Sequence, residues 1–187
     1  MPSASLVRWR HDRMPRLSEI DAQCAAALAL TPPRPNLVDE NLRGFTLLLS
    51  AHFQGFCRDL YTECATIIGL RVRPRLRVLI QNQFAAHRKL DHGNPTAQNL
   101  RDDFERFGFT LDLTAADPAN AARLHDLAAL NRWRNVAAHH GTIPAGLPLD
   151  LPSLRGWRHS CDGLATSLDA IMYNETRRIL RRAPWVP

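Results

Sequence analysis

The sequence predicts an all-α protein, a bundle of five to six helices. Three observations support this fold class. Apolar residues recur at steps of three and four along most of the chain, the spacing that places them on one face of a helix. Glycines and prolines gather in clusters that separate these stretches. The segments between them are too short and too irregular to build a β-sheet.

The strongest predicted helix lies between the prolines at residues 32–35 and Gly69. Its apolar positions keep the helical spacing throughout: Leu42, Phe45, Leu49, Phe53, Phe56, Leu60, Cys64 and Ile67. Residues 109–113 are expected to be a short extended connector. The other predicted helices cover residues 16–30, 74–91, 96–107, 118–140 and 153–182, with Thr96 as an N-cap and prolines 74 and 118 in first turns.

The composition indicates a single globular domain with an excess of positive charge. The chain has 187 residues, of which 45% are hydrophobic and 22% charged. Lysine and arginine number 24 against 18 acidic residues, so the net charge is +6, and Lys89 is the one lysine. Arginine suits bidentate contacts with phosphate, although a GC-rich coding genome produces the same excess.

Several classes of protein are excluded by what the sequence lacks. No apolar run reaches the length of a transmembrane helix, and the first residues do not have the apolar run of a signal peptide. The four cysteines form no C-x-x-C pair, so neither a zinc site nor a dense disulfide framework is indicated. We therefore expect a reduced, cytoplasmic protein with no membrane contact, no metal and no cofactor.

The chain is expected to divide into three segments. Residues 1–35 form an N-terminal extension with one short helix, and its first fifteen or so residues are expected to be loosely ordered. Residues 36–182 form the helical domain. Residues 183–187 form a tail.

One segment, residues 131–141, combines residue types that suit phosphodiester cleavage. Arg134 and Asn135 fall on the last turns of a predicted helix, and His139 follows Asn135 by four residues, so these two share a face. An imidazole acts as acid or base near neutral pH, and a guanidinium pairs with phosphate and stabilises developing charge. The 2′-OH of ribose supplies the nucleophile. The trio therefore fits RNA cleavage without a metal.

The same segment has a structural interpretation, in which histidines at a helix end bond its last carbonyl groups and the arginines are solvated. Next to the trio, Arg132 and Trp133 are candidates for RNA binding, although the core or a dimer interface is the first interpretation of Trp133. On the long helix, His52 and Asp59 are candidates for supporting the active site. An ordinary core histidine is the alternative for His52.

Residues 134–141, Arg-Asn-Val-Ala-Ala-His-His-Gly, resemble the signature of the HEPN superfamily, an arginine followed four to six positions later by a histidine. Residues 48–61 are similar to the long helix of its RiboL-PSP branch. The resemblance covers residues 36–180 and implies an up-and-down helical bundle. Family members commonly have one histidine before the glycine, whereas two stand here. His139 keeps the register with Asn135 and is our first candidate for the catalytic histidine, and His140 is the second.

The resemblance implies a metal-independent endoribonuclease that leaves 2′,3′-cyclic phosphate and 5′-OH ends. It also implies a homodimer with the two motifs facing each other, and we place that interface at Trp133, Val136, Ala137 and Ile143. A role as a toxin or anti-phage defence effector, controlled by an antitoxin or regulatory partner protein, rests on the family alone. The alternative is a catalytically inactive helical dimer that binds RNA, a nucleotide or a partner protein.

Overall fold

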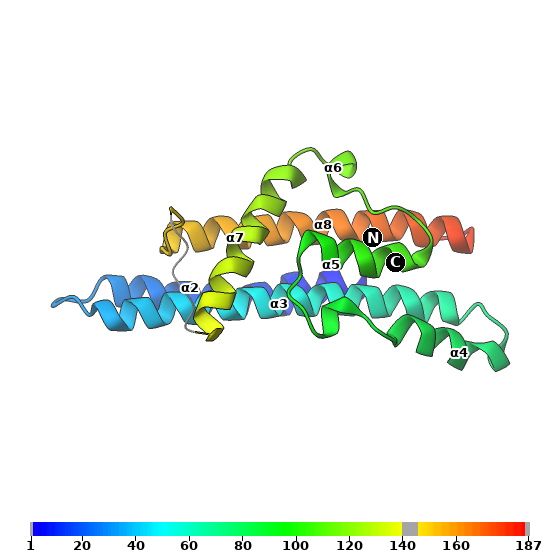
Figure 1. Ribbon diagram of the computed structural model, residues 1–187, viewed down its shortest axis with the longest axis horizontal. Helices are drawn as coiled ribbons and strands as arrows, with labels where there is room; N and C mark the ends of the chain where they lie inside the picture. Colours follow the sequence, from blue (N-terminus) through cyan, green and yellow to red (C-terminus); the bar gives the residue numbers. More distant parts are fainter. Residues whose placement is uncertain (1, 140–145, 186–187) are drawn as a thin grey trace.

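The computed structural model describes residues 2–139 and 146–185, and within these ranges all regular structure is helical. The predicted all-α class is confirmed. Figure 1 shows two long helices, α3 (Pro35–Gly69) and α8 (Leu151–Leu180), running along the length of the molecule. α7 (Asn120–His139) crosses them steeply and packs on both.

The lengths of α3 and α8 follow from their ends and their apolar faces. At about 1.5 Å per residue, the 35 residues of α3 span roughly 50 Å. Pro35 stands in its first turn, where a missing N–H costs nothing. α8 begins after Asp150, whose carboxylate accepts a hydrogen bond from the Ser153 N–H at 2.8 Å. The structure therefore confirms both long helices that the periodicity predicts, within two residues of the expected ends of α8.

The N-terminal segment differs from the expectation of loose order. α1 (Ala4–Arg8), a π-helical turn η1 (Trp9–Arg13) and α2 (Met14–Leu28) follow one another without a break. The Ser3 hydroxyl caps the start by accepting a hydrogen bond from the Leu6 N–H at 3.0 Å. The Glu63 carboxylate accepts hydrogen bonds from the next free N–H groups, those of residues 4 and 5, at 3.0 and 2.9 Å.

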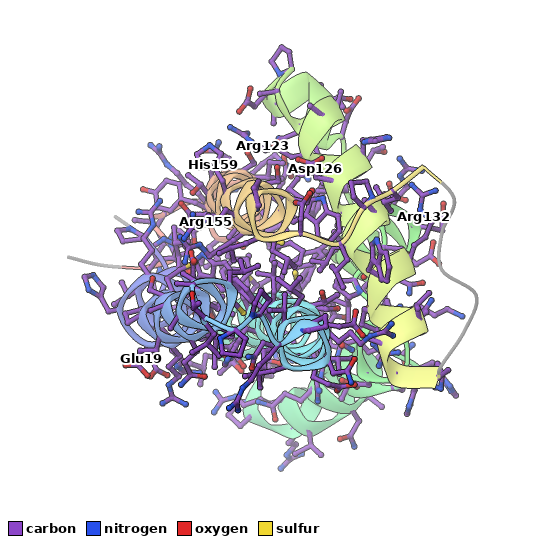
Figure 2. All side chains as sticks on the ribbon, turned by 90° about the vertical axis from the view of Figure 1, so that its left-hand side faces the viewer. Glu19, Arg123, Asp126, Arg132, Arg155 and His159 are labelled. Atoms are coloured by element: carbon purple, nitrogen blue, oxygen red, sulfur yellow. The ribbon has the colours of Figure 1, made fainter. Side chains whose placement is uncertain are left out.

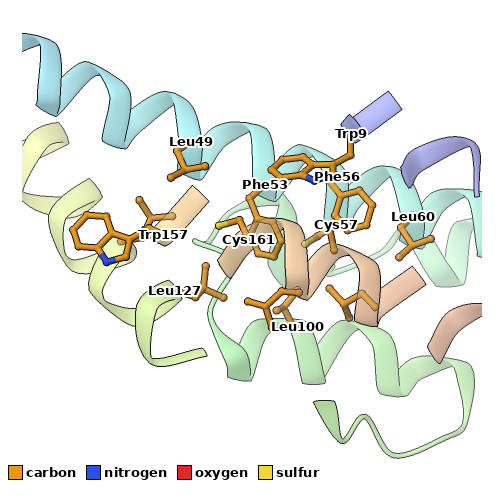
Figure 3. Close-up of a cluster of buried hydrophobic side chains, with 14 of the residues drawn as sticks. Trp9, Leu49, Phe53, Phe56, Cys57, Leu60, Leu100, Leu127, Trp157 and Cys161 are labelled. Atoms are coloured by element: carbon orange, nitrogen blue, oxygen red, sulfur yellow. The ribbon is translucent and has the colours of Figure 1, made fainter. Parts of the chain in front are cut away.

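A continuous hydrophobic core joins this N-terminal helix to the rest of the chain. Trp9 is fully buried and meets Phe53 edge to face, with ring centroids 6.0 Å apart. Figure 3 shows Trp9 beside Phe53 and Phe56. Residues 4–28 are therefore part of the bundle's packing. Other members of the same core are Leu49, Cys57, Leu60, Leu100, Leu127, Trp157 and Cys161.

In the middle of the chain, some helices end at other residues than the sequence predicts. α4 (Pro74–Ala85) stops six residues early, and a positive φ of 56° at His87 separates it from the 3-10 turn η2 (Lys89–Asp91). α5 (Ala97–Phe104) begins after Thr96, whose hydroxyl caps the Asn99 N–H as predicted. The 3-10 turn η3 (Glu105–Phe107) continues α5, and α6 (Leu113–Ala116) follows the connector.

None of the helices in the described part of the chain has the combination of length and hydropathy that a bilayer crossing needs. Ser3 and Trp185, near the two ends of the described chain, both contact the C-terminal half of α8. The Ser3 N–H donates to the Asp169 carboxylate at 3.1 Å, and the ring of Trp185 lies 5.7 Å from that of Tyr173.

Candidate functional site

The site that the sequence predicts lies on α7, which has two distinct faces. Its inner face carries the large apolar side chains, and these are buried in the bundle: Leu127, Leu130, Trp133 and Val136. Its outer face carries a stripe of exposed residues at steps of four, three and four: Ala128, Arg132, Asn135 and His139. Asn135 and His139 therefore share a face, and His139 is the last residue of α7.

A pair of hydrogen bonds holds the Asn135 side chain in place. Its Oδ1 accepts one from Asn94 Nδ2 at 2.9 Å and one from Arg134 Nη1 at 3.3 Å. Asn94 lies in the loop between η2 and α5, and its own backbone carbonyl accepts a hydrogen bond from Asn99 Nδ2 at 2.7 Å. The amide group of Asn135 is thus fixed from both sides. It connects the Arg134 guanidinium to the loop that precedes α5.

Next to this amide lies a pocket of about 270 Å³ between α7 and the start of α5. None of the described residues that line it carries a carboxylate, and three of them are asparagines. The lining residues are Asn94, Thr96, Ala97, Leu124, Ala128, Asn131, Arg132 and Asn135. The pocket therefore joins an apolar wall to several amide groups and one guanidinium.

Asn131 is a residue of this pocket that the sequence analysis did not single out. It is 5% exposed, and its Nδ2 donates to the Pro95 carbonyl at 3.3 Å. Its Oδ1 accepts no hydrogen bond from any described residue. A buried amide oxygen without a donor costs about 1–3 kcal/mol. Asn131 precedes Asn135 by one helical turn, and this spacing is the signal that could have placed both on one wall.

Arg132 and Trp133, the two residues predicted to contact RNA, point in different directions. Arg132 is exposed and lines the pocket, and Figure 2 shows it projecting on the side of α7 away from α8 and α2. Trp133 is only 3% exposed, and its Nε1 donates to the Leu147 carbonyl at 3.1 Å. A ring enclosed in this way is unable to stack on a base, and Trp133 fits the core position that the sequence analysis also gave for it.

Two of the apolar residues predicted to form the centre of a dimer interface are not available for it. Trp133 and Val136 are buried within the chain's own core, because they fall on the inner face of α7. Ala137 is half-buried. Ile143, His140 and Gly141 lie outside the described residues.

The two candidates on α3, His52 and Asp59, are held by the N-terminal helix. The Arg13 guanidinium donates to the His52 carbonyl at 2.7 Å and pairs with the Asp59 carboxylate at 2.7 Å. Arg8 pairs with the same carboxylate at 2.9 Å. No contact among the described residues joins His52 or Asp59 to Arg134 or His139, and their role in support of the site stays a prediction.

The ionisation of His52 agrees with a structural position. Burial, followed by the positive charges of Arg13 and Arg16, lowers the pKa of its imidazole below the ordinary value. The neutral form is therefore favoured. His52 fits the alternative that the sequence analysis kept open, an ordinary histidine packed between two helices.

The cysteine side chains lie in the core and are not placed for chemistry. All four cysteines are buried and free. Burial raises the pKa of Cys64 to about 12 and that of Cys57 well above its usual value, which makes both thiols unreactive near neutral pH. Among the described residues, no group of three or more histidine, cysteine, aspartate or glutamate side chains is arranged to hold a metal ion.

The arrangement on α7 has the parts for binding an anion. Arg134 is half-buried, which weakens solvent screening of its charge, and Arg132 lies on the same helix. His139 stands one turn beyond Asn135 and is exposed.

Searches against models of known families, curated proteins and solved structures found no match to this chain.

Proposed function

We propose that this protein is an endoribonuclease whose active site is the C-terminal end of α7. The single observation that carries the proposal is the fixed amide of Asn135, which accepts hydrogen bonds from Arg134 and Asn94 and precedes His139 by one turn. This amide accepts a hydrogen bond from the Arg134 guanidinium, and the exposed His139 follows one turn later on the same helix. The resemblance of residues 134–141 to the HEPN signature adds a second, independent argument.

In this proposal, the 2′-OH of one ribose attacks the adjacent phosphorus. The new bond joins O2′ to phosphorus, and the bond from phosphorus to O5′ breaks. A base removes the proton from the 2′-OH, and an acid delivers one to the departing 5′-oxygen. The products are a 2′,3′-cyclic phosphate and a 5′-OH end, with no water consumed.

Each residue has a role that its position allows. His139 is the proton carrier in this proposal, because it is exposed one turn beyond Asn135 and imidazole is a common general acid–base group in catalysis. Arg134 stabilises the extra negative charge of the five-coordinate phosphorus. It is suited to this because only Nη1 is engaged by a described residue, so its other N–H groups are available to phosphate oxygens. Asn135 holds Arg134 in position.

The same proposal includes a homodimer, because the cleavage reaction needs two proton-carrying groups. One imidazole is unable to remove a proton and deliver another at the same instant. A second copy related by a two-fold axis would bring a second His139 and a second Arg134 to the phosphate. Sedimentation at micromolar concentration is expected to show a dimer. A fully active monomer would contradict the shared site.

The biological setting of such an enzyme is proposed from the resemblance alone. A toxin or anti-phage effector in the cytoplasm, restrained by an antitoxin or regulatory partner protein, fits an endoribonuclease of this kind. The alternative function is a helical module that binds RNA, a nucleotide or a partner protein without cleaving anything. The two are separated by whether RNA is cut.

The test is incubation of the purified protein with a mixed RNA pool in EDTA. Wild-type protein is expected to cut RNA and to leave 2′,3′-cyclic phosphate ends. His139→Ala and Arg134→Ala are each expected to lower the rate by about 100-fold or more. His125→Ala is the matched control, because His125 is an exposed histidine of the same helix outside the site. Binding of RNA without cleavage, or cleavage that needs magnesium and survives both substitutions, would contradict the proposal.

A further inference from the structure

The pocket beside Asn135 is a second feature of the site, and the cleavage chemistry does not use it. Its volume of about 270 Å³ lies just below the range of about 300–1,000 Å³ that holds drug-sized ligands. A group the size of one flat heterocycle suits this volume. Its walls come from α7 and from the start of α5.

The polar groups of the pocket are amides, which are the side chains that read base edges. Asn131 Oδ1 is buried behind the pocket surface and accepts no hydrogen bond from a described residue, so a ligand donor would satisfy it once the Asn131 side chain turns toward the pocket. Asn135 Oδ1 is already occupied by two donors, and no described acceptor engages its Nδ2, which remains free to donate. The pocket therefore has one free donor on a lining residue and one unsatisfied acceptor within its wall. A nucleobase edge carries a donor beside an acceptor and complements this pair.

The remaining walls supply contacts for the face of a planar ring. Ala97 on α5 and Ala128 on α7 both line the pocket and are small, exposed residues. Arg132 lines the same pocket, and a guanidinium plane stacks well on a base. No described lining residue carries a carboxylate that would repel an RNA strand.

We infer that this pocket binds one unstacked nucleobase of a single-stranded RNA, and this inference rests on the proposed function. A base inside a duplex is stacked and paired, and its edge is unavailable to Asn131 and Asn135. The substrate class is therefore single-stranded RNA. The base held beside Asn135 places its neighbouring phosphate near Arg134, which shares the Asn135 oxygen.

The first experiment measures binding of free nucleosides by NMR, because a nucleoside has no phosphate to pair with the arginines. Millimolar adenosine, cytidine, guanosine and uridine are added separately to ¹⁵N-labelled protein. At least one is expected to shift the side-chain amide signals of Asn94, Asn131 and Asn135, and ribose alone is expected to shift none. Equal effects of ribose and the nucleosides, or no effect of any nucleoside, would overturn the inference.

Two variants place a phenyl ring in the pocket, one from each of the two helices that line it. Ala128→Phe and Ala97→Phe change exposed residues, so each is expected to fold, which a thermal unfolding scan checks. Both are expected to weaken nucleoside binding by about tenfold or more and to lose the preference for single-stranded over duplex RNA. Ala121→Phe adds the same ring to an exposed position of α7 outside the pocket and is expected to behave as wild type.

The outcomes separate the inference from the function on which it rests. Nucleoside binding that both filling variants abolish, together with no RNA cleavage, would support the pocket and contradict the proposed function. RNA cleavage that depends on His139 but treats single strands, duplexes and the filling variants alike would support the function and overturn the pocket.

Discussion

The side chain of Asn94 donates a hydrogen bond to the side-chain oxygen of Asn135 at 2.9 Å, across 41 residues of sequence. This contact joins the loop before α5 to the last turns of α7. Arg134 donates to the same oxygen at 3.3 Å, so the position of the guanidinium depends on a loop that no local pattern connects with it. The contact explains how a helix end becomes an ordered site.

Replacement of Asn94 by alanine tests this contact. Asn94→Ala removes one of the two hydrogen bonds that fix Asn135, and Arg134 is then held less well. We expect RNA cleavage to fall by about tenfold, equivalent to roughly 1.4 kcal/mol, with an unchanged melting temperature. Asn82→Ala, at an exposed position of α4, is the control and is expected to keep full activity. Equal rates for the two variants would show that the contact does not position the site.

The two neighbouring histidines are expected to differ in importance. His139 lies one turn after Asn135 on the exposed stripe of α7. His140→Ala should therefore retain more cleavage activity than His139→Ala in matched single-turnover kinetics. The reverse order would transfer the proton-carrying role to His140.

The N-terminal helix is expected to contribute strongly to stability. Trp9 is fully buried against Phe53 and Phe56, so Trp9→Ala removes a large side chain from the core. The free energy of unfolding in urea should fall by about 3–5 kcal/mol. Val7→Ala, at a residue 42% exposed, is the control and should change it by less than about 0.5 kcal/mol. A small effect of Trp9→Ala would mean that residues 4–28 do not share the core.

His52 is expected to make stability depend on pH. Burial and the nearby arginines lower its pKa in the folded protein, while the unfolded chain keeps a value of about 6.5. Below that value the unfolded state binds a proton that the folded state does not, so stability falls as the pH drops from about 7 to 5. His52→Gln should flatten this dependence in unfolding measurements. His11→Gln, at an exposed histidine, should leave the slope as it is.

Much of the fold was predictable because it follows from local periodicity. α3 and α8 carry apolar residues at helical spacing over many turns, and proline, glycine and Asp150 mark their ends. The helix over 16–30 was predicted, but the order of residues 4–13 was missed because this stretch is rich in arginine. The structure shows that Arg8 and Arg13 pair with Asp59 while Trp9 enters the core, and a single chain offers no sign of these distant partners.

The candidate site was predictable in part, for the same physical reason. Helical register places Asn135 and His139 on one face, and it also places Trp133 on the face of Leu127 and Leu130, which is inside the bundle. That register argued against Trp133 as a stacking residue. The pocket was not predictable, because Asn94 reaches Asn135 through tertiary packing and looks in the sequence like part of an ordinary turn.

The central claim, that the 2′-OH is the nucleophile at the end of α7, is tested most directly with a DNA oligonucleotide containing one ribonucleotide. Wild-type protein in EDTA is expected to cut this strand at the single ribose and to leave a 2′,3′-cyclic phosphate there. His139→Ala is expected to cut it about 100-fold more slowly. An all-DNA strand cut at an equal rate, or a product without the cyclic phosphate, would contradict the account.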